Sequence, residues 1–110
     1  VKDRPQFHIS IAKDISPFCD CYGGNDVPII PDVGMFASFD PVAIDQAAAD
    51  KCNAQKPMSD SYLTEMIHEH HGDDHDHFCV MHPGTNWEVT LEHAEKIGVG
   101  TRSYELVEIK

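Results

Sequence analysis

The chain has 110 residues, of which 41% are apolar, and a formal net charge of −11 with His counted as neutral. This length predicts one domain with a modest core. The negative charge argues against polyanionic partners, so we expect neither nucleic-acid binding nor attachment to an anionic membrane surface. No stretch approaches the roughly 18 apolar residues of a membrane span.

The N-terminal residues, Val-Lys-Asp-Arg-Pro, contain neither an initiator Met nor the apolar segment of a signal peptide. We therefore expect residues 1–110 to be a single domain taken from a longer protein, and we expect a cytoplasmic location. The four cysteines, Cys19, Cys21, Cys52 and Cys79, are too few and too irregularly spaced for the disulfide framework of a secreted domain.

Two segments in the first part of the chain predict strands. Residues 7–15 alternate between apolar and polar side chains, and we expect the face with Phe7, Ile9 and Ile11 to be buried. Residues 33–39 are almost entirely apolar, which is typical of a central strand covered on both faces. The stretch between them is rich in Pro and Gly and has no period, and loops of this length are often functional.

Residues 40–53 predict a helix, because Asp40 suits the N-cap and Pro41 suits the first helical position. Small apolar residues recur on one face of this segment, so the helix can pack close to a sheet. A second helix is predicted over residues 59–71, with Gly72 as its C-terminal stop.

A third helix is predicted over residues 86–97, where Thr85 and Glu88 are spaced as a capping box. Residues 103–109 predict a last strand. The expected fold class is therefore α/β: a small sheet of about three strands with about three helices packed on it.

The motif Cys19-Asp20-Cys21 is the sharpest chemical feature. Thiolates are soft ligands, and two of them can supply two corners of a tetrahedral metal site without completing it. Free thiols or a strained short-range disulfide also fit this spacing. If the first two strands were parallel, one sheet edge would gather the cysteines with acidic residues. Those residues are Asp26, Asp32, Asp40 and Asp45.

A second cluster is the tract HEHHGDDHDH, residues 68–77. His-rich tracts can bind divalent metals. The candidate ligands are His68, His71, His75 and His77, with His82 further along the chain. Glu65 and His68 resemble half of a carboxylate di-metal motif. A solvated helix end followed by a polar turn is the alternative interpretation, and His70 falls on the apolar face of the predicted helix.

Several motifs together resemble a family of uncharacterised bacterial and archaeal iron–sulfur-centre proteins that is classed as a domain of unknown function. They are the Cys-Asp-Cys motif at 19–21, DVPIIPDVG at 26–34 and DPVAID at 40–45. The tail from Trp87 through AEKIGVG to SYEL is similar too, so the resemblance covers residues 7–53 and 82–109.

The resemblance implies that the chain is the C-terminal part of a longer protein, in which a ferredoxin-like module holds 4Fe–4S clusters. The cysteines of that module are absent here, so the clusters are expected only in the missing module. The His-rich tract, Cys52 and Cys79 depart from the family pattern.

We therefore expect a metal- or redox-linked accessory domain of an iron–sulfur protein, with Cys19 and Cys21 as ligands or redox thiols. A divalent metal such as zinc is the candidate cofactor. Two alternatives stay open: a domain that only packs against its parent protein, and part of an enzyme site completed in the full-length chain. The expected partners are the remainder of the parent chain, a redox partner and a second copy of this chain.

Overall fold

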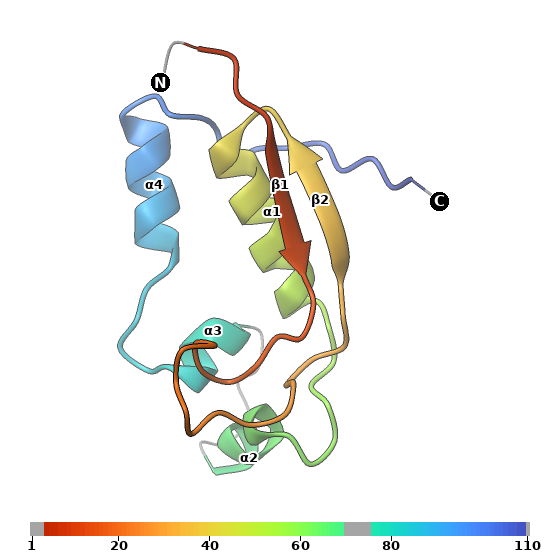
Figure 1. Cartoon of the computed structure of the whole chain (residues 1–110). Coiled ribbons are helices and arrows are strands. Elements are labelled where there is room, and N and C mark those ends of the chain that lie inside the picture. The colour runs from red at the N-terminus through yellow and green to blue at the C-terminus, as the bar shows by residue number, and fades with distance from the viewer. Residues whose placement is uncertain (1–3, 70–75, 110) are drawn as a thin grey trace.

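The computed structural model describes residues 4–69 and 76–109. Figure 1 shows their arrangement. The elements are β1 (His8–Ala12), β2 (Gly34–Ser38), α1 (Pro41–Asn53), α2 (Tyr62–Glu69), α3 (His77–Met81) and α4 (Glu88–Lys96). The mixed α/β class and the three predicted helices are confirmed, and α3 lies where the sequence predicted only a polar connection. No helix in the described part of the chain is long and apolar enough to cross a bilayer.

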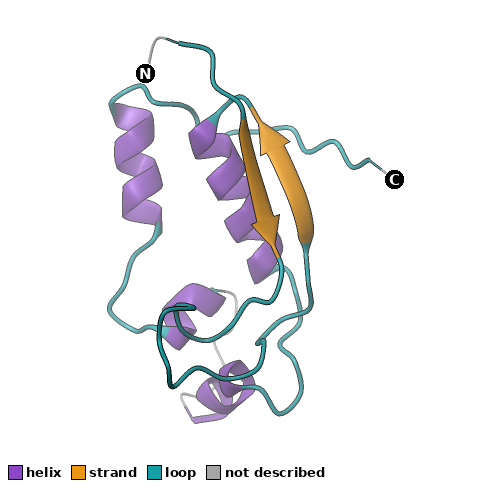
Figure 2. Cartoon of the chain, viewed as in Figure 1, coloured by secondary structure: helices purple, strands orange, loops and turns teal. Residues whose placement is uncertain are grey.

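The two strands pair in an antiparallel sheet, with Ile9 opposite Ala37 (Figure 2). The end of β1 therefore lies beside the start of β2, and the start of α1 lies at the other end of the sheet. The parallel arrangement that would gather all the candidate residues at one edge is not formed. The loop after β1 and the N-terminus of α1 open at opposite ends.

The sheet buries the face opposite to the predicted one. Phe7, Ile9 and Ile11 are 59%, 60% and 65% exposed, whereas Ala12 on the other face is buried against α1. Small side chains on that face let the Ala-rich side of α1 approach closely, and alternation alone cannot say which of two faces a helix covers. β2 is likewise not covered on both faces, because Met35 is exposed.

The third predicted strand is not formed. Residues 103–109 are extended but belong to no ladder among the described residues, and Figure 1 shows them leading away from the sheet. A strand needs a neighbour for its backbone N–H and C=O groups. The Tyr104 hydroxyl instead donates a hydrogen bond to Asp50 Oδ2 at 2.7 Å, which ties the start of this tail to α1.

Helix α1 begins as predicted. Asp40 Oδ1 accepts hydrogen bonds from the backbone N–H groups of Val42 (2.9 Å) and Ala43 (3.1 Å), and Pro41 occupies the first helical position. These bonds satisfy donors that have no partner inside the helix. Ile44 and Cys52 of this helix are buried.

The other helix ends differ from the prediction. Helix α2 is shorter than the predicted 59–71, and Gly72 lies outside the described residues. The capping box at α4 is wrong: the Thr85 hydroxyl donates to His82 O at 2.6 Å, and the helix starts without a side-chain cap. Asp76 caps α3 by accepting from Cys79 N, a role the sequence analysis missed.

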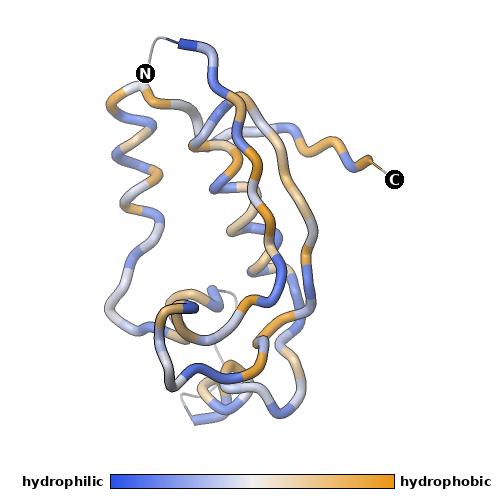
Figure 3. Tube along the Cα trace, viewed as in Figure 1, coloured by the Kyte–Doolittle hydropathy of each residue, from blue (hydrophilic) through white to orange (hydrophobic). Residues whose placement is uncertain are grey.

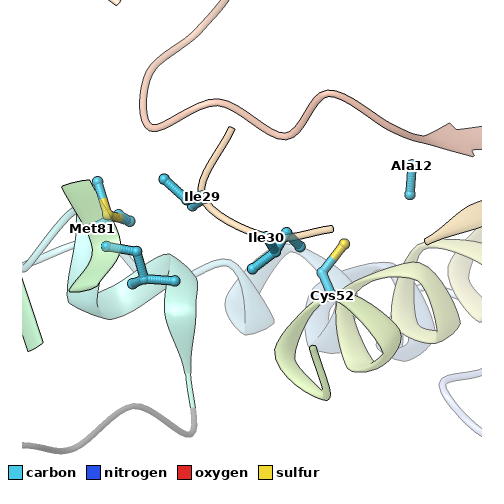
Figure 4. Close-up of a cluster of buried hydrophobic side chains, with 6 residues drawn as sticks. Ala12, Ile29, Ile30, Cys52 and Met81 are labelled. Carbon is cyan, nitrogen blue, oxygen red and sulfur yellow. The ribbon is translucent and has the colours of Figure 1, made fainter. Parts of the chain in front are cut away.

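The hydrophobic core lies where the loop after β1 meets the end of α1, α2 and α3. Figure 4 shows Ile29 and Ile30 of the loop lying between Met81 and Cys52. Leu63 of α2 is fully buried in the same cluster. Burying each large apolar side chain contributes about 1.5–3 kcal/mol, so these contacts hold the loop in place.

Candidate functional site

The cysteine loop, residues 13–33, is closed at its base by three hydrogen bonds. Val33 N donates to Ala12 O (2.9 Å), Asp14 N donates to Asp32 Oδ1 (2.9 Å) and Ile29 N donates to Ile15 O (2.8 Å). Asp14 has a positive φ of 50°, which short polar residues tolerate better than most others. The Asp32 carboxylate thus holds the two ends of the loop together.

The tip of the loop is organised by Asn25, which the sequence analysis did not single out. Its side-chain amide donates to Ser16 Oγ (3.0 Å) and Phe18 O (2.8 Å), and its carbonyl accepts from Phe18 N (3.1 Å). Tyr22 N donates to Cys19 O at 2.9 Å, which closes a tight turn around the cysteine motif. The position of the two thiols is therefore set by the fold of the loop.

Cys19 and Cys21 are both exposed, and their Sγ atoms lie 3.2 Å apart. The Cys21 backbone N–H and its S–H group both donate to Cys19 Sγ, and these two bonds lower the pKa of the Cys19 thiol. A lower pKa raises the fraction of thiolate, the form that binds metals and attacks electrophiles. The Cys19 thiol is therefore more readily ionised than an ordinary cysteine.

The Sγ separation can be compared with the two products that a thiol pair forms. Two thiolates at tetrahedral corners of a zinc ion, with Zn–S of about 2.3 Å, stand roughly 3.8 Å apart. A disulfide requires about 2.05 Å. The observed 3.2 Å is nearer to the metal-bound spacing, and exposed side chains can adjust by this amount through small χ1 rotations.

The other two cysteines lie in different surroundings. Cys52 is buried in the core, and burial raises the pKa of its thiol. The Cys79 thiol donates to Asp76 Oδ2 at 3.3 Å, a bond that raises its pKa. A 4Fe–4S cluster needs four thiolates around it. The four cysteines of this chain do not supply such a set, so the residues present do not fit a cluster.

Three of the four acidic candidates accept hydrogen bonds from backbone N–H groups. Asp26 Oδ1 accepts from Val27 N at 2.8 Å, and Asp32 closes the base of the loop. Asp40 caps α1 at the far end of the sheet, and Asp45 is exposed on α1. Among the described residues, none of these carboxylates is hydrogen-bonded to the thiols of Cys19 and Cys21, which bond to each other.

The histidine candidates that the structure describes, His68, His77 and His82, lie on different segments of the chain. His68 is exposed on α2, while His70, His71 and His75 lie outside the described residues. His82 Nε2 is 2.8 Å from Pro17 O, and its ring packs on Phe18 with centroids 5.5 Å apart. Within residues 4–69 and 76–109, no three His, Cys, Asp or Glu side chains gather closely enough to hold a metal ion.

A pocket of about 240 Å³ lies directly beneath the cysteine loop. Its walls come from the loop, the end of α1 and α3, and they are mainly apolar. The main apolar wall residues are Ile15, Phe18, Ile29, Ile30, Phe78 and Met81. Cys19 belongs to this wall and to the thiol pair, so the pocket and the thiols adjoin.

His77 also belongs to the pocket wall and is 4% exposed. Its Nε2 lies 2.8 Å from Gln55 O, and a carbonyl only accepts, so Nε2 carries the proton. The other ring nitrogen, Nδ1, is then an acceptor, and it is buried without a hydrogen-bond partner among the described atoms. Leaving such an atom unsatisfied costs about 1–3 kcal/mol. The tract that the sequence presented as a ligand run thus places one histidine in the core.

A family model described as "Domain of unknown function (DUF362)" matches residues 2–50, which include β1, the cysteine loop, β2 and most of α1. No curated protein and no solved structure matches the chain. The match supports the predicted resemblance to an uncharacterised domain family, and the link to iron–sulfur proteins stays a prediction. The first part of this chain, including the cysteine pair and its loop, is therefore similar to a domain family of unknown function.

Proposed function

We propose that this chain is an accessory domain that supplies two thiolate ligands, Cys19 and Cys21, to a soft metal centre. The observation that carries the proposal is the pair of exposed Sγ atoms 3.2 Å apart on a turn fixed by Asn25. Exposure matters because the remaining ligands must come from outside this loop. The resemblance to iron–sulfur-centre proteins agrees with a soft-metal role.

The chemistry follows from the thiol pair. A thiol must lose its proton before it binds a metal, so each metal ion bound by the pair releases two protons. The lowered pKa of Cys19 makes its proton easier to remove than that of an ordinary cysteine. A tetrahedral ion then has two open corners, which the rest of the parent chain, a redox partner or a second copy of this chain fills.

A zinc titration of the chain, purified without a His-tag column, tests this. We expect binding with two protons released per zinc ion. In Cys19→Ser and in Cys21→Ser the affinity falls at least about tenfold, since even losing a residue that only orients a ligand costs that much. Cys79→Ser is the matched control, because Cys79 bonds to Asp76 away from the loop. Equal zinc affinity in wild type and in the Cys19→Ser/Cys21→Ser variant contradicts the proposal.

The alternative of a packing domain is favoured by a different observation. The apolar sheet face, made of Phe7, Ile9, Ile11, Met35 and Phe39, is exposed, and Figure 3 shows hydrophobic residues on both strands. The ring centroids of Phe7 and Phe39 are 5.2 Å apart, so at this end the apolar face continues from one strand to the other. Contiguous exposed apolar patches of large area mark interaction sites. In this second proposal the face packs against the remainder of the parent chain.

Fluorescence of the dye ANS, which reports exposed apolar surface, tests the second proposal. We expect the chain to bind ANS. A double variant with Ile9→Asp and Ile11→Asp should lose most of that binding with little change in melting temperature. Val107→Asp is the control, because Val107 is at least as exposed as Ile9 and Ile11 but lies on the C-terminal tail. The second proposal is wrong if the sheet variant and the tail variant lose the same amount of signal.

A further inference from the structure

We propose that Cys19 and Cys21 form a thiol–disulfide exchange site, at which the pair reduces an exposed, positively charged disulfide and is itself oxidised to a disulfide. This activity goes beyond the proposed function, because it uses the two thiols without a metal ion. The two uses also exclude each other, since a thiol pair joined in a disulfide has no thiolate left to bind a metal.

The turn that carries the two sulfur atoms places them for exchange. Both thiols are exposed, their Sγ atoms are 3.2 Å apart, and the bond from Tyr22 N to Cys19 O closes the turn around them. Joining the two atoms takes an approach of roughly 1.2 Å to the disulfide length. A second thiol held this close reacts as an intramolecular group, so it closes the disulfide much faster than a thiol from solution does.

Cys19 has the properties of the attacking thiol. Its Sγ atom accepts hydrogen bonds from the S–H group and from the backbone N–H of Cys21. These bonds favour the thiolate, which is the form that attacks a disulfide, and they lower the pKa of the Cys19 thiol. Cys21 is then the resolving thiol, because its sulfur lies beside the mixed disulfide that Cys19 forms.

The exchange has two steps. After losing its proton to water, the Cys19 thiol attacks one sulfur of the substrate, the S–S bond of the substrate breaks, and one half leaves as a thiolate. Cys21 then loses its proton to water and attacks Cys19 Sγ, so that the mixed disulfide breaks and the second half leaves. Both leaving thiolates take up a proton, so the substrate gains the two electrons and two protons that the cysteine pair loses.

The charge of the cysteine loop sets the class of disulfide. Residues 13–33 contain one basic residue, Lys13, which lies 3.6 Å from Asp14, and three further aspartates. Two of these, Asp20 and Asp26, are exposed on the part of the loop that carries the cysteines. Together with the net charge of −11, these carboxylates attract a cationic disulfide and repel an anionic one.

Cystamine, a disulfide with an ammonium group on each half, tests the activity when it is added in excess to the metal-free full chain. Peptide mapping by mass spectrometry should find Cys19 and Cys21 joined to each other, with little cysteamine retained. In Cys21→Ser, whose hydroxyl can still donate to Cys19 Sγ, the reaction should stop at a cysteamine adduct on Cys19. A wild-type chain that keeps this adduct without closing the disulfide overturns the proposal.

Two other thiols test whether the reaction belongs to the pair. The Cys79 thiol donates to Asp76 Oδ2 at 3.3 Å, a bond that raises its pKa, so it should react several-fold more slowly than Cys19. In Cys19→Ser, an adduct on Cys21 should likewise form more slowly than the adduct on Cys19 does in Cys21→Ser. Equal rates at Cys79 and Cys19 contradict the site, and equal rates in the two serine variants contradict the assigned roles.

Glutathione disulfide, which is anionic, tests the charge preference. Each rate is divided by the rate of the same disulfide with mercaptoethanol, an uncharged thiol. At low ionic strength the normalised rate of cystamine should be about tenfold higher, and about 1 M salt should remove most of the difference. Equal normalised rates at low ionic strength contradict the preference for a cationic disulfide.

Asn25→Ala tests the role of the turn. This variant keeps both thiols but loses the bonds from Asn25 to Ser16 and Phe18, so the adduct on Cys19 should persist several-fold longer before the disulfide closes. Circular dichroism shows whether the rest of the chain stays folded. Closure as fast as in wild type would mean that the turn does not place the thiols.

The zinc titration separates this inference from the metal proposal. A chain that binds zinc with release of two protons but does not close the disulfide contradicts exchange and leaves the metal proposal standing. A chain that closes the disulfide but binds no zinc supports exchange and contradicts the metal proposal.

Discussion

The two ends of the sheet are held by different forces. One end of the sheet carries the cysteine loop, and there Ile29 and Ile30 of the loop are buried in one cluster with Leu63 and Met81. At the opposite end, where α1 begins, the anchors are polar. Asp40 Oδ2 accepts from Thr101 N at 2.9 Å, which joins the N-terminus of α1 to the segment after α4.

The polar end is a connected network around Arg102. Its guanidinium donates to Gln46 Oε1 (2.7 Å) and Glu88 Oε1 (3.1 Å), and Glu95 Oε2 accepts from Arg102 N (2.6 Å). Gly100 lies so close to the Asp40 carboxylate that a side chain there would collide with it. Carboxylates at this end are committed to backbone and Arg donors.

The comparison separates residues that build the fold from residues free to do chemistry. Asp40 has the residue type of a metal ligand, yet its oxygens are used by three backbone N–H groups. The thiols of Cys19 and Cys21, in contrast, are hydrogen-bonded to each other and are exposed to solvent. The thiols are therefore the candidate site because their sulfur atoms are not engaged by the backbone, whereas the Asp40 carboxylate is.

The largest effect is expected at the apolar end. Ile30→Ala should lower the free energy of unfolding by about 3 kcal/mol, because it leaves a cavity in the core where Ile30 is 2% exposed. Ile11→Ala, on the exposed sheet face, is the control and should change stability by less than about 0.5 kcal/mol. Urea unfolding monitored by circular dichroism measures both. Similar losses in the two variants would mean that the loop end is not anchored by burial.

An intermediate effect is expected at the polar end. Asp40→Ala removes the α1 cap and the bond to Thr101, and should cost about 2 kcal/mol, from about 1 for the cap and about 1 for the added hydrogen bond. Asp40→Asn keeps an N-cap acceptor and should lose less. Thermal unfolding of the two variants measures the difference. If Asp40→Asn is as unstable as Asp40→Ala, the charge matters and the cap geometry does not.

The smallest effect concerns the link between the tail and α1. The hydrogen bond to Asp50 raises the pKa of Tyr104 to about 12. The folded state thus holds this proton more tightly than the unfolded state, whose tyrosine has a pKa of about 10. The resulting stability is fully present below pH 10 and is lost as the pH rises through 12. Because Tyr104 is 38% exposed, solvent screening reduces this contribution to about 1 kcal/mol.

Urea unfolding of wild type and Tyr104→Phe between pH 8 and about 12 measures this contribution. The stability difference between the two proteins should shrink as the pH rises across this window. A difference that stays constant would show that the Asp50 bond does not persist in solution.

Local signals in the sequence predicted the helices well and the sheet poorly. Asp40 and Pro41 fixed the start of α1 because capping depends on neighbours within three residues. The buried face of β1 was predicted wrongly because alternation defines two faces, while the choice between them depends on where α1 packs. The strand predicted at 103–109 needed a neighbouring strand, which no local pattern can provide.

The candidate site shows the same division. The Cys-x-Cys spacing predicted two adjacent thiols, and the structure brings Cys19 and Cys21 together. The grouping of Asp40 and Asp45 with them depended on strand direction, which the residues do not encode locally, and the antiparallel pairing of β1 and β2 places the start of α1 at the other end of the sheet. The burial of His77 was missed because it depends on contacts with Asn53 and Gln55, more than twenty residues away in the chain.

The closed base of the cysteine loop has a consequence for how this region can vary. The bond from Asp14 N to Asp32 and the bond from Val33 N to Ala12 hold the two ends together whatever lies between them. The entropy of closing a loop grows only slowly with its length, so insertions near Gly23 and Gly24 cost little. The same scaffold can therefore accept exchanged loop tips, and a tip that carries other ligands could be grafted here while the sheet and α1 stay unchanged.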